Sequence, residues 1–372
     1  MLKVLIACGG TGGHINPGLA IAGIIAAHEP DAEFLFAGTP HGMEAQLVPA
    51  AGYPIEFVQV AGFQRSFSPE NIVRNLKAVG YLMTAGSRAK EIVKKFQPDL
   101  AIGTGGYAAG PVIRAAQQLG IPTLVHEQNA YPGVTNKLLA KKAKAVMMTF
   151  EAAKEHFPDG TKTVMTGLPV RGSLTKRSRE EARRMLGFSQ GMTILSFGGS
   201  QGAKCLNDLM PDLMEWHLKS DMEINHIHAY GKFGRETVPQ ALEAKGIAQD
   251  KRMRVTEYIH DMDVCLAAAD LVISRAGAST LSELEAVGRA SVLIPYPAAA
   301  ENHQYHNAMV LGKAGAGIVI EQKNLTLEKL KDAVRELYEN PNKRETMGQR
   351  AGALFPQDTD ERIWKVIAGV LK

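Results

Sequence analysis

Cysteine is scarce in this sequence, which has only Cys8, Cys205 and Cys265 among 372 residues. Their number is odd and none stands in a Cys-x-x-Cys spacing, so we expect neither a disulfide framework nor a zinc site, and a reducing compartment is favoured. Long apolar runs are also missing. The longest, residues 18–27, has about ten residues, whereas a membrane-spanning helix needs about twenty. We therefore predict no spanning segment, and the apolar start indicates a buried strand rather than a secretion signal.

An excess of charge of one sign is nearly absent as well. The formal net charge is only +4, which argues against nucleic acid as a partner. The composition is 45% hydrophobic and 22% charged, with 37 glycines, which excludes a disordered chain or a simple repeat array. Because 372 residues exceed what one hydrophobic core usually holds, we expect two domains.

Short apolar runs alternate with helical patterns along the chain. We predict buried strands at residues 4–7, 34–37, 100–102, 123–126 and 146–149, and a second series at residues 193–197, 224–230, 254–256, 271–274 and 292–295. Each series has the βαβ signature of a doubly wound parallel sheet. The basic stretch 171–184 is the expected linker between the two α/β domains. An apolar stripe in residues 358–372 predicts a terminal helix that could pack on either domain.

Three glycine-rich loops follow predicted strands, at residues 9–20, 103–111 and 198–203. In the first, Asn16 is a plausible helix N-cap and Pro17 the first helical residue. Glycine lets the backbone approach a ligand, and a helix start offers free N–H groups to an anion. One such loop is common in any α/β domain, but three of them, spread over both domains, favour phosphate binding.

A nicotinamide or flavin enzyme is disfavoured by the details of these loops. None of them matches Gly-x-Gly-x-x-Gly cleanly, and the second strand ends in Gly38-Thr39, where a ribose-binding acid would be expected. The phosphate-binding pattern that ends in Gly-Lys-Ser/Thr is absent too.

Polar residues gather near the last strands of the second series. Thr280 and Glu283 have the spacing of a capping box, although Glu283 could instead accept hydrogen bonds from a ribose at the carboxyl edge of the sheet. The pattern alone favours the cap. The segment 301–304, Glu-Asn-His-Gln, is either an ordinary polar surface loop or a site for sugar hydroxyls.

Five motifs in this order, GGTGGHINPGLA, TGGYAAGP, HEQNAYPGVTNK, GGSQGA and SRAGASTLSELEAVG…ENHQYHNA, resemble the MurG family. Its members transfer N-acetylglucosamine from UDP-N-acetylglucosamine to lipid-linked muramyl-pentapeptide, converting lipid I into lipid II for peptidoglycan. The likeness covers nearly the whole chain. It implies the GT-B fold, with two Rossmann-like domains and a cleft between them: an acceptor domain over 1–168, a donor domain over 169–357, and helix 358–372 packing back on the first.

The resemblance also implies roles for individual residues. Ile259 would contact uracil through its backbone and Glu283 the ribose, which overturns the preference for a pure cap. Donor contacts are implied for Thr11, Gly12, Gly13, Asn129, Arg171, Ser200, Gln201, Ile259, Glu283, His303 and Gln304. Acceptor diphosphate contacts are implied for Gly13, Gly105, Gly106 and Tyr107. Two departures from the family pattern are Leu168, where asparagine is usual, and Glu301, where aspartate is common.

A β-1,4 product from an α-linked UDP-sugar requires one in-line displacement, so a single base suffices. His14, at the end of the first glycine loop, is the preferred base and Glu127 the second candidate. The helix start near residues 277–280 is suited to the departing diphosphate. Two Asp-x-Asp strings, 261–263 and 358–360, should begin helices, so no required metal is expected. No cofactor is expected either.

The lipid-linked acceptor implies docking on an anionic membrane surface. Residues 63–95 mix large apolar side chains with basic ones, and a second basic cluster consists of Lys137, Lys141, Lys142 and Lys144. By themselves these are solvated helix faces; beside a lipid substrate they suit a peripheral enzyme. The resemblance implies the cytoplasmic face of a bacterial plasma membrane, with cell-wall and division machinery as candidate partners.

Three alternatives stay open at this stage. A UDP-N-acetylglucosamine 2-epimerase would share the fold and donor site but need no acceptor. A UDP-sugar sensor would bind donor without turnover. A transferase acting on a soluble small molecule is the nearest rival.

Overall fold

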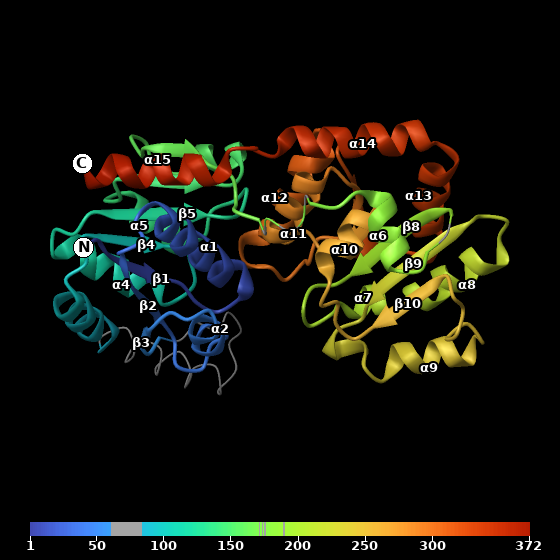
Figure 1. The fold of residues 1–372 in the computed structure, drawn as a ribbon, viewed down its shortest axis with the longest axis horizontal. Helices are drawn as coiled ribbons and strands as arrows, with labels where there is room; N and C mark the ends of the chain where they lie inside the picture. The colour runs from blue at the N-terminus through green and yellow to red at the C-terminus, as the bar shows by residue number, and fades with distance from the viewer. Residues whose placement is uncertain (61–83, 171, 173, 175, 189) are drawn as a thin grey trace. The chain divides into compact units, whose positions relative to one another are not determined.

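The computed structural model divides into two compact units, Met1–Pro169 with Asp358–Lys372, and Val170–Gln357 (Figure 1). It describes residues 1–60, 84–170, 172, 174, 176–188 and 190–372. Arg171 and residues 63–83 of the predicted membrane segment lie outside the described residues.

The first unit contains a seven-stranded parallel sheet of order β3-β2-β1-β4-β5-β6-β7. Its strands are β1 (Lys3–Ala7), β2 (Glu33–Gly38), β3 (Ile55–Phe57), β4 (Leu100–Gly103), β5 (Thr123–Glu127), β6 (Ala145–Met148) and β7 (Thr163–Met165). The five predicted strands are confirmed. The edge strands β3 and β7 were missed because three residues, only partly buried, leave no continuous apolar run.

The second unit has a six-stranded parallel sheet of order β10-β9-β8-β11-β12-β13. Its strands are β8 (Met192–Phe197), β9 (Ile224–Ala229), β10 (Met253–Thr256), β11 (Leu271–Ser274), β12 (Ala290–Leu293) and β13 (Ile318–Val319). All five predicted strands of this series are present, and the two-residue edge strand β13 is added. Both units thus have the expected α/β class.

Helices connect the strands in each unit. Those of the first unit are α1 (Gly12–His28), α2 (Glu44–Ala50), α4 (Ala109–Gln118), α5 (Val134–Ala140), η1 (Glu151–His156), a helical stretch at residues 84–96, and α15 (Thr359–Leu371). Those of the second are α6 (Arg179–Met185), α7 (Lys204–Asn207), α8 (Met210–Lys219), η2 (Lys232–Gly234), α9 (Thr237–Ala244), α10 (Met262–Ala268), α11 (Ala278–Val287), η3 (Ala300–Asn302), α12 (His303–Lys313), η4 (Gln322–Asn324), α13 (Leu327–Glu339) and α14 (Pro341–Leu354).

Helix α1 begins earlier than predicted. Thr11 is its N-cap and Gly12 its first residue, so Asn16 is not the cap and Pro17 lies inside the helix. The prediction was wrong because Gly12 and Gly13, assigned to a loop, adopt helical backbone angles. His14 consequently belongs to the first turn of α1 rather than to the end of a loop.

The start of α11 also differs from the prediction. This helix begins at Ala278 with Gly277 as N-cap, so Thr280 already lies in the first turn and the capping box with Glu283 does not form. Asp261 does stand at the start of α10, but its carboxylate pairs with Arg254 at 2.8 Å instead of capping the helix. Asp358, at the start of α15, likewise pairs with Arg362 at 2.7 Å.

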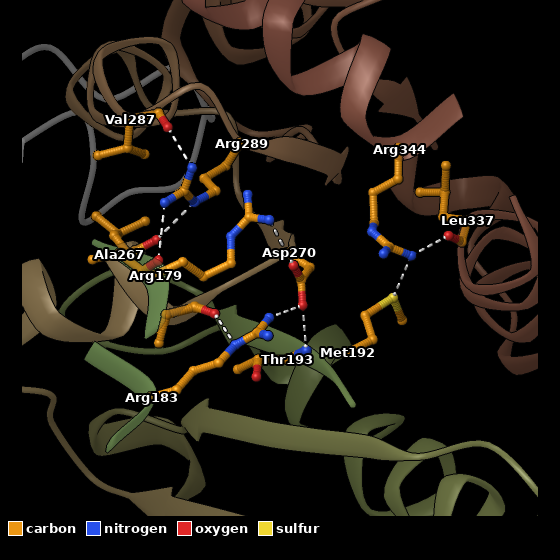
Figure 2. Close-up of polar contacts among 12 residues, drawn as sticks. Arg179, Arg183, Met192, Thr193, Ala267, Asp270, Val287, Arg289, Leu337 and Arg344 are labelled. Atoms are coloured by element: carbon orange, nitrogen blue, oxygen red, sulfur yellow. Dashed lines mark hydrogen bonds and ion pairs between the residues drawn. The ribbon is translucent and has the colours of Figure 1, made fainter. Parts of the chain in front are cut away.

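The basic stretch 171–184 is not a free linker, because its second half forms α6. Arg183 pairs with Asp270, and Arg179 Nη1 lies 3.2 Å from Asp270 Oδ1, which fixes α6 near the amino end of β11 (Figure 2). Arg289 donates to carbonyls at the C-terminal ends of α10 and α11. Cations at helix C-termini are stabilising, so this arginine cluster has a structural explanation.

Helix α15 packs on the first unit, beside α1 (Figure 1). Ile363 and Ile367 are fully buried in the cluster that contains the α1 and β1 side chains. Trp364 stacks on His28 of α1, with ring centroids 4.4 Å apart. The apolar stripe predicted the helix, but the complementary surface of α1 decided where it packs.

Candidate functional site

The loop after β1 is held by a buried carboxylate on α2. Glu44 is fully buried and accepts hydrogen bonds from the backbone N–H groups of Gly10, at 3.0 Å, and Thr39, at 2.8 Å. Burial acts to raise the pKa of Glu44, but the hydrogen bonds from Thr39 and Gly10 outweigh it and lower the pKa. A side chain on Gly9 would approach Glu44 Oε1 to 2.7 Å. One N–H group of this glycine loop is therefore committed to Glu44.

His14 is half-buried where the first two glycine loops meet. Its Nδ1 lies 3.1 Å from Gln128 Oε1, and its carbonyl accepts a hydrogen bond from Thr104 Oγ1 at 2.7 Å. Gly105 has φ +106°, and a Cβ there would lie 2.7 Å from His14 Nδ1. Gly106 has φ +84° and leaves no room for a Cβ beside the Gly9 carbonyl. These two glycines permit the close contact between the loops.

The strand ends explain why these loops meet. Ala7 of β1 lies opposite Gly103 of β4, and Gly103 lies opposite Val125 of β5. Because the strands are parallel, the segments that follow them emerge at one edge of the sheet. The structure therefore brings together the predicted residues of the first unit at the carboxyl edge of this sheet: Thr11, Gly12, Gly13, His14, Gly105, Gly106, Tyr107, Glu127 and Asn129.

Glu127 has no free oxygen lone pair for an incoming hydroxyl. Its Oε1 accepts from the Asn129 backbone N–H and from Asn129 Nδ2, and its Oε2 accepts from Gly133 N–H and from Asn136 Nδ2, at 2.8–3.2 Å. The residue is 1% exposed, and burial raises its pKa although these hydrogen bonds and the charge of His14 oppose that shift. Glu127 thus orders the turn before α5, and His14 is the better placed of the two candidate bases.

A second group of loops lies at the carboxyl edge of the β8–β13 sheet. Phe197 lies opposite both Ala229 and Ser274, and Ser274 lies opposite Leu293. Ser200 and Gln201 are exposed on the loop after β8. The Gln201 carbonyl accepts a hydrogen bond from the Phe233 N–H at 3.0 Å, which ties this loop to the one after β9.

The remaining predicted residues of this unit occupy neighbouring loops and helix starts. Ile259, in the loop after β10, is 4% exposed, which leaves its backbone rather than its side chain for contacts. Glu283 is half-buried in α11, and His303 and Gln304 form the first turn of α12. Only Arg171 of the predicted site lies in the part of the chain that the structure does not describe.

Arg275 and Asn307 connect these loops and were missed by the sequence reasoning. Arg275 Nη1 donates to the carbonyls of Ile294 and Pro295 at 3.1 and 3.2 Å. The fully buried Asn307 of α12 donates from Nδ2 to the Ala276 carbonyl at 3.2 Å. Burial lowers the pKa of Arg275, and the negative forms of Cys205 and Tyr296 would act in the opposite direction. Arg275 Nη2 also donates to Gln322 Oε1 at 2.7 Å. No sequence signal could reveal these roles, because the partners belong to segments distant in sequence.

The segment before α12 is backbone-strained. Glu301 and Asn302 have φ values of +52° and +51°, which non-glycine residues rarely adopt. The following turn is tied down by Gln304 Oε1, which accepts from Tyr296 N–H at 3.0 Å. His303 Nδ1 lies 2.7 Å from the Ala300 carbonyl. Such strain persists only where surrounding contacts enforce it, and it is concentrated at functional sites.

Within the described residues, no group of three or more histidine, cysteine or acidic side chains is arranged to hold a metal ion. The same part of the chain has no helix with the length and apolar character needed to cross a bilayer.

Comparison with known proteins identifies the family. Residues 4–148 match the glycosyltransferase family 28 N-terminal domain, and residues 193–363 match the family 28 C-terminal domain. The chain belongs to glycosyltransferase family 28 and, within it, to the MurG family. It is therefore a glycosyltransferase of GT-B fold.

Relatives within this family match the chain from end to end. A protein of Acetivibrio thermocellus named UDP-N-acetylglucosamine–N-acetylmuramyl-(pentapeptide) pyrophosphoryl-undecaprenol N-acetylglucosamine transferase is 43% identical, covering 100% of this chain and 99% of its own. A Desulfitobacterium hafniense protein of the same name is 46% identical over 98% of each chain. The crystal structure of Acinetobacter baumannii MurG superposes with a TM-score of 0.79 at 30% identity, covering 99% of this chain and 100% of that one.

Proposed function

We propose that this chain transfers N-acetylglucosamine from UDP-N-acetylglucosamine to the 4-hydroxyl of lipid-linked N-acetylmuramyl-pentapeptide, converting lipid I into lipid II in peptidoglycan synthesis. The observation that carries the proposal is the similarity over the full length, at 43% and 46% identity, to relatives named for this reaction. The clustering of the motif residues at the carboxyl edges of both sheets supports it, because ligands of doubly wound folds bind at that edge.

The donor belongs to the second unit in this proposal. The start of α11 and the loop after β8 would hold the diphosphate, since both offer backbone N–H groups. Ile259 would contact uracil and Glu283 the ribose, while His303 and Gln304 would hold the sugar hydroxyls. Further donor contacts are proposed for Thr11, Gly12, Gly13, Asn129, Arg171, Ser200 and Gln201.

The acceptor belongs to the first unit. Gly13, Gly105, Gly106 and the exposed Tyr107 would contact its diphosphate. His14 would take the proton of the 4-hydroxyl while the oxygen attacks the anomeric carbon. In the same displacement the bond from that carbon to the diphosphate breaks, UDP leaves with the electron pair, and the configuration inverts. The α11 start would stabilise the leaving charge with dipoles already in place.

Because the proposed acceptor carries a lipid, we propose that the enzyme associates peripherally with the cytoplasmic face of a membrane. Helix α5 supports it, because Val134 and Leu138 are 55% and 62% exposed one turn apart, next to Lys137 and Lys141. An apolar strip flanked by cations suits anionic lipid. Partners in cell-wall and division machinery remain part of this proposal.

The decisive experiment measures UDP release from UDP-N-acetylglucosamine with and without a lipid I analogue. Release that requires the analogue, with a disaccharide product, is expected. Conversion of the UDP-sugar without acceptor would indicate an epimerase, and donor binding without turnover would indicate a sensor. Transfer to soluble acceptors only would overturn the lipid-linked substrate.

A further inference from the structure

A relay of hydrogen bonds runs from His14 through Gln128 and His126 to the backbone of Gly167. His14 Nδ1 lies 3.1 Å from Gln128 Oε1, and Gln128 Nε2 lies 3.1 Å from His126 Nδ1. His126 Nε2 in turn lies 3.1 Å from the Gly167 carbonyl oxygen. His126 and Gln128 are 0% and 2% exposed, so bulk water does not compete for these contacts. All four residues belong to the first unit.

The direction of every hydrogen bond in the chain follows from its far end. A carbonyl oxygen only accepts, so His126 Nε2 must carry the proton and its Nδ1 must be the acceptor. The Gln128 amide nitrogen therefore faces His126, and it also donates to the His126 carbonyl at 3.0 Å. This second contact independently fixes the orientation of the amide. Gln128 Oε1 is thus turned to His14, whose Nδ1 must carry the proton.

Burial keeps the His126 ring of this chain of hydrogen bonds in one protonation state. Burial lowers the pKa of His126 to about 4, so the ring is neutral around pH 7 and has one donor and one acceptor nitrogen. The accepting carbonyl is fixed as well, because Gly167, with φ +82°, donates its own N–H to the Met148 carbonyl at 3.0 Å.

We propose that Gln128 and His126 are positioning residues that hold His14 in its Nδ1–H tautomer, which leaves the Nε2 lone pair to take the acceptor proton. The inference rests on the proposed function of His14. It matters because the other tautomer would present an N–H group to the acceptor hydroxyl and could not accept its proton. Elsewhere a wrong histidine tautomer has reduced turnover about 10⁴-fold.

The side chains of the motif segment His126–Asn129 point to two sides of the chain and have different partners on each side. Successive side chains at the end of a strand alternate in direction. Gln128 contacts His14 and His126 contacts Gln128, whereas Glu127 turns to Asn136 and the turn before α5. Glu127 nevertheless interacts electrostatically with His14, whose charge acts to lower the pKa of Glu127 against the effect of burial. The Gly105 backbone covers the Nδ1 side of the ring.

The tautomer can be read directly from ¹⁵N-histidine NMR spectra of the full chain near pH 7.5, without substrate. We expect His14 to show an Nδ1–H pattern and His126 an Nε2–H pattern. An Nε2–H pattern for His14 in the wild-type protein would overturn the proposal, whatever the transferase activity. The spectrum does not depend on turnover. An inactive protein with the expected tautomers would therefore contradict the proposed function but not the relay.

The Gln128→Leu variant tests whether the relay controls turnover. Gln117→Leu is the matched control, because Gln117 Nε2 also donates two hydrogen bonds, at 3.1 and 3.0 Å, far from His14 in the hydrogen-bond network. We expect Gln128→Leu to lower kcat at least 10-fold, with the donor KM within about threefold, and to shift His14 toward the Nε2–H tautomer. Equal kcat losses in the two variants would contradict the relay.

Gln128→Glu provides the second variant if Gln128→Leu folds poorly. A carboxylate can still accept from His14 Nδ1–H but cannot donate to His126. We expect His14 to keep its tautomer, a kcat above that of Gln128→Leu, and an acid limb of the kcat/KM profile moved to higher pH. An acid limb that does not move would show that residue 128 does not contact the base, and it would count against the relay.

Discussion

Gly105 lies so close to His14 that its missing side chain shapes the proposed base. Its φ of +106° and the 2.7 Å approach of a Cβ to the ring nitrogen are two separate constraints. Gly120 has φ +79° but no atom within 4 Å of a Cβ. Substitutions at these two positions therefore distinguish the effect of backbone strain from the effect of displacing the His14 imidazole.

We predict that Gly105→Ala lowers kcat about 100-fold, because a displacement of about 1 Å at a reacting group can have that effect. Gly120→Ala should lose comparable stability, about 1 kcal/mol, with normal turnover. Steady-state kinetics and urea unfolding of both variants measure the difference. Equal activity of the two variants would show that His14 tolerates the new methyl group.

A second prediction at the residue scale concerns His14 itself. His14→Ala should lower kcat about 10²- to 10⁴-fold with little change in donor affinity, because a general base acts only on the reacting hydroxyl. Lys204→Ala is a suitable control, since that side chain is exposed and pairs with Asp208 one turn away. Donor affinity is measured by titration and turnover by UDP release. Near-normal turnover would remove His14 from the role.

The direction of helix α12 depends on strained backbone in the residues that precede it. Two successive left-handed residues, Glu301 and Asn302, precede it, so His303 and Gln304 enter the first turn in a defined direction. The carbonyls held by Arg275 fix the preceding strand end. The direction of α12 thus depends on backbone geometry as much as on its own sequence.

We expect Asn302→Gly to preserve the donor KM, because glycine adopts positive φ without strain. Asn302→Val should raise the donor KM severalfold and destabilise the protein by at least about 1 kcal/mol, since a β-branched side chain disfavours that region. Asn342→Val, at an exposed position of α14, controls for the loss of the amide. Similar KM values for the glycine and valine variants would contradict this.

At the scale of the whole molecule, three buried histidines in the second unit link stability to pH. Burial lowers the pKa of His217 to about 3 and that of His228 to about 4, and the pKa of His226 lies well below its usual value. Their folded pKa values lie below the unfolded value of about 6.5. The unfolded chain therefore binds more protons below that pH, and stability declines as the pH falls from about 6.5 toward 4.

We predict that the second unit loses about 2 kcal/mol from His217 alone between pH 7.5 and 5. His217→Leu should flatten that dependence, because both ring nitrogens of His217 are buried without hydrogen-bond partners among the described atoms. Trp216, whose ring lies 5.2 Å from that of His217, reports unfolding by fluorescence in a Trp364→Phe background. Parallel pH profiles for wild type and His217→Leu would argue that the neighbouring histidines dominate.

The local pattern of the sequence determined the α/β class, because a buried parallel strand needs a continuous apolar run and each crossover helix an amphipathic one. Ten strands were predicted in this way. The terminal helix was also visible in its stripe of Ile363, Val366, Ile367 and Val370. The motif residues could be grouped because parallel strands bring their carboxyl ends to one edge.

Only the tertiary structure decided how the grouped residues work. Gly12 and Gly13, which were predicted to be loop residues, lie in α1, so His14 is a helical residue. Gly105 and Gly106 permit a close contact between two loops. Glu127, a candidate base by motif, is a buried carboxylate whose oxygens already accept hydrogen bonds, whereas the neighbouring Gln128 contacts His14. The reason is physical: periodicity follows burial within one element, whereas hydrogen-bond partners and close backbone contacts arise between elements distant in sequence.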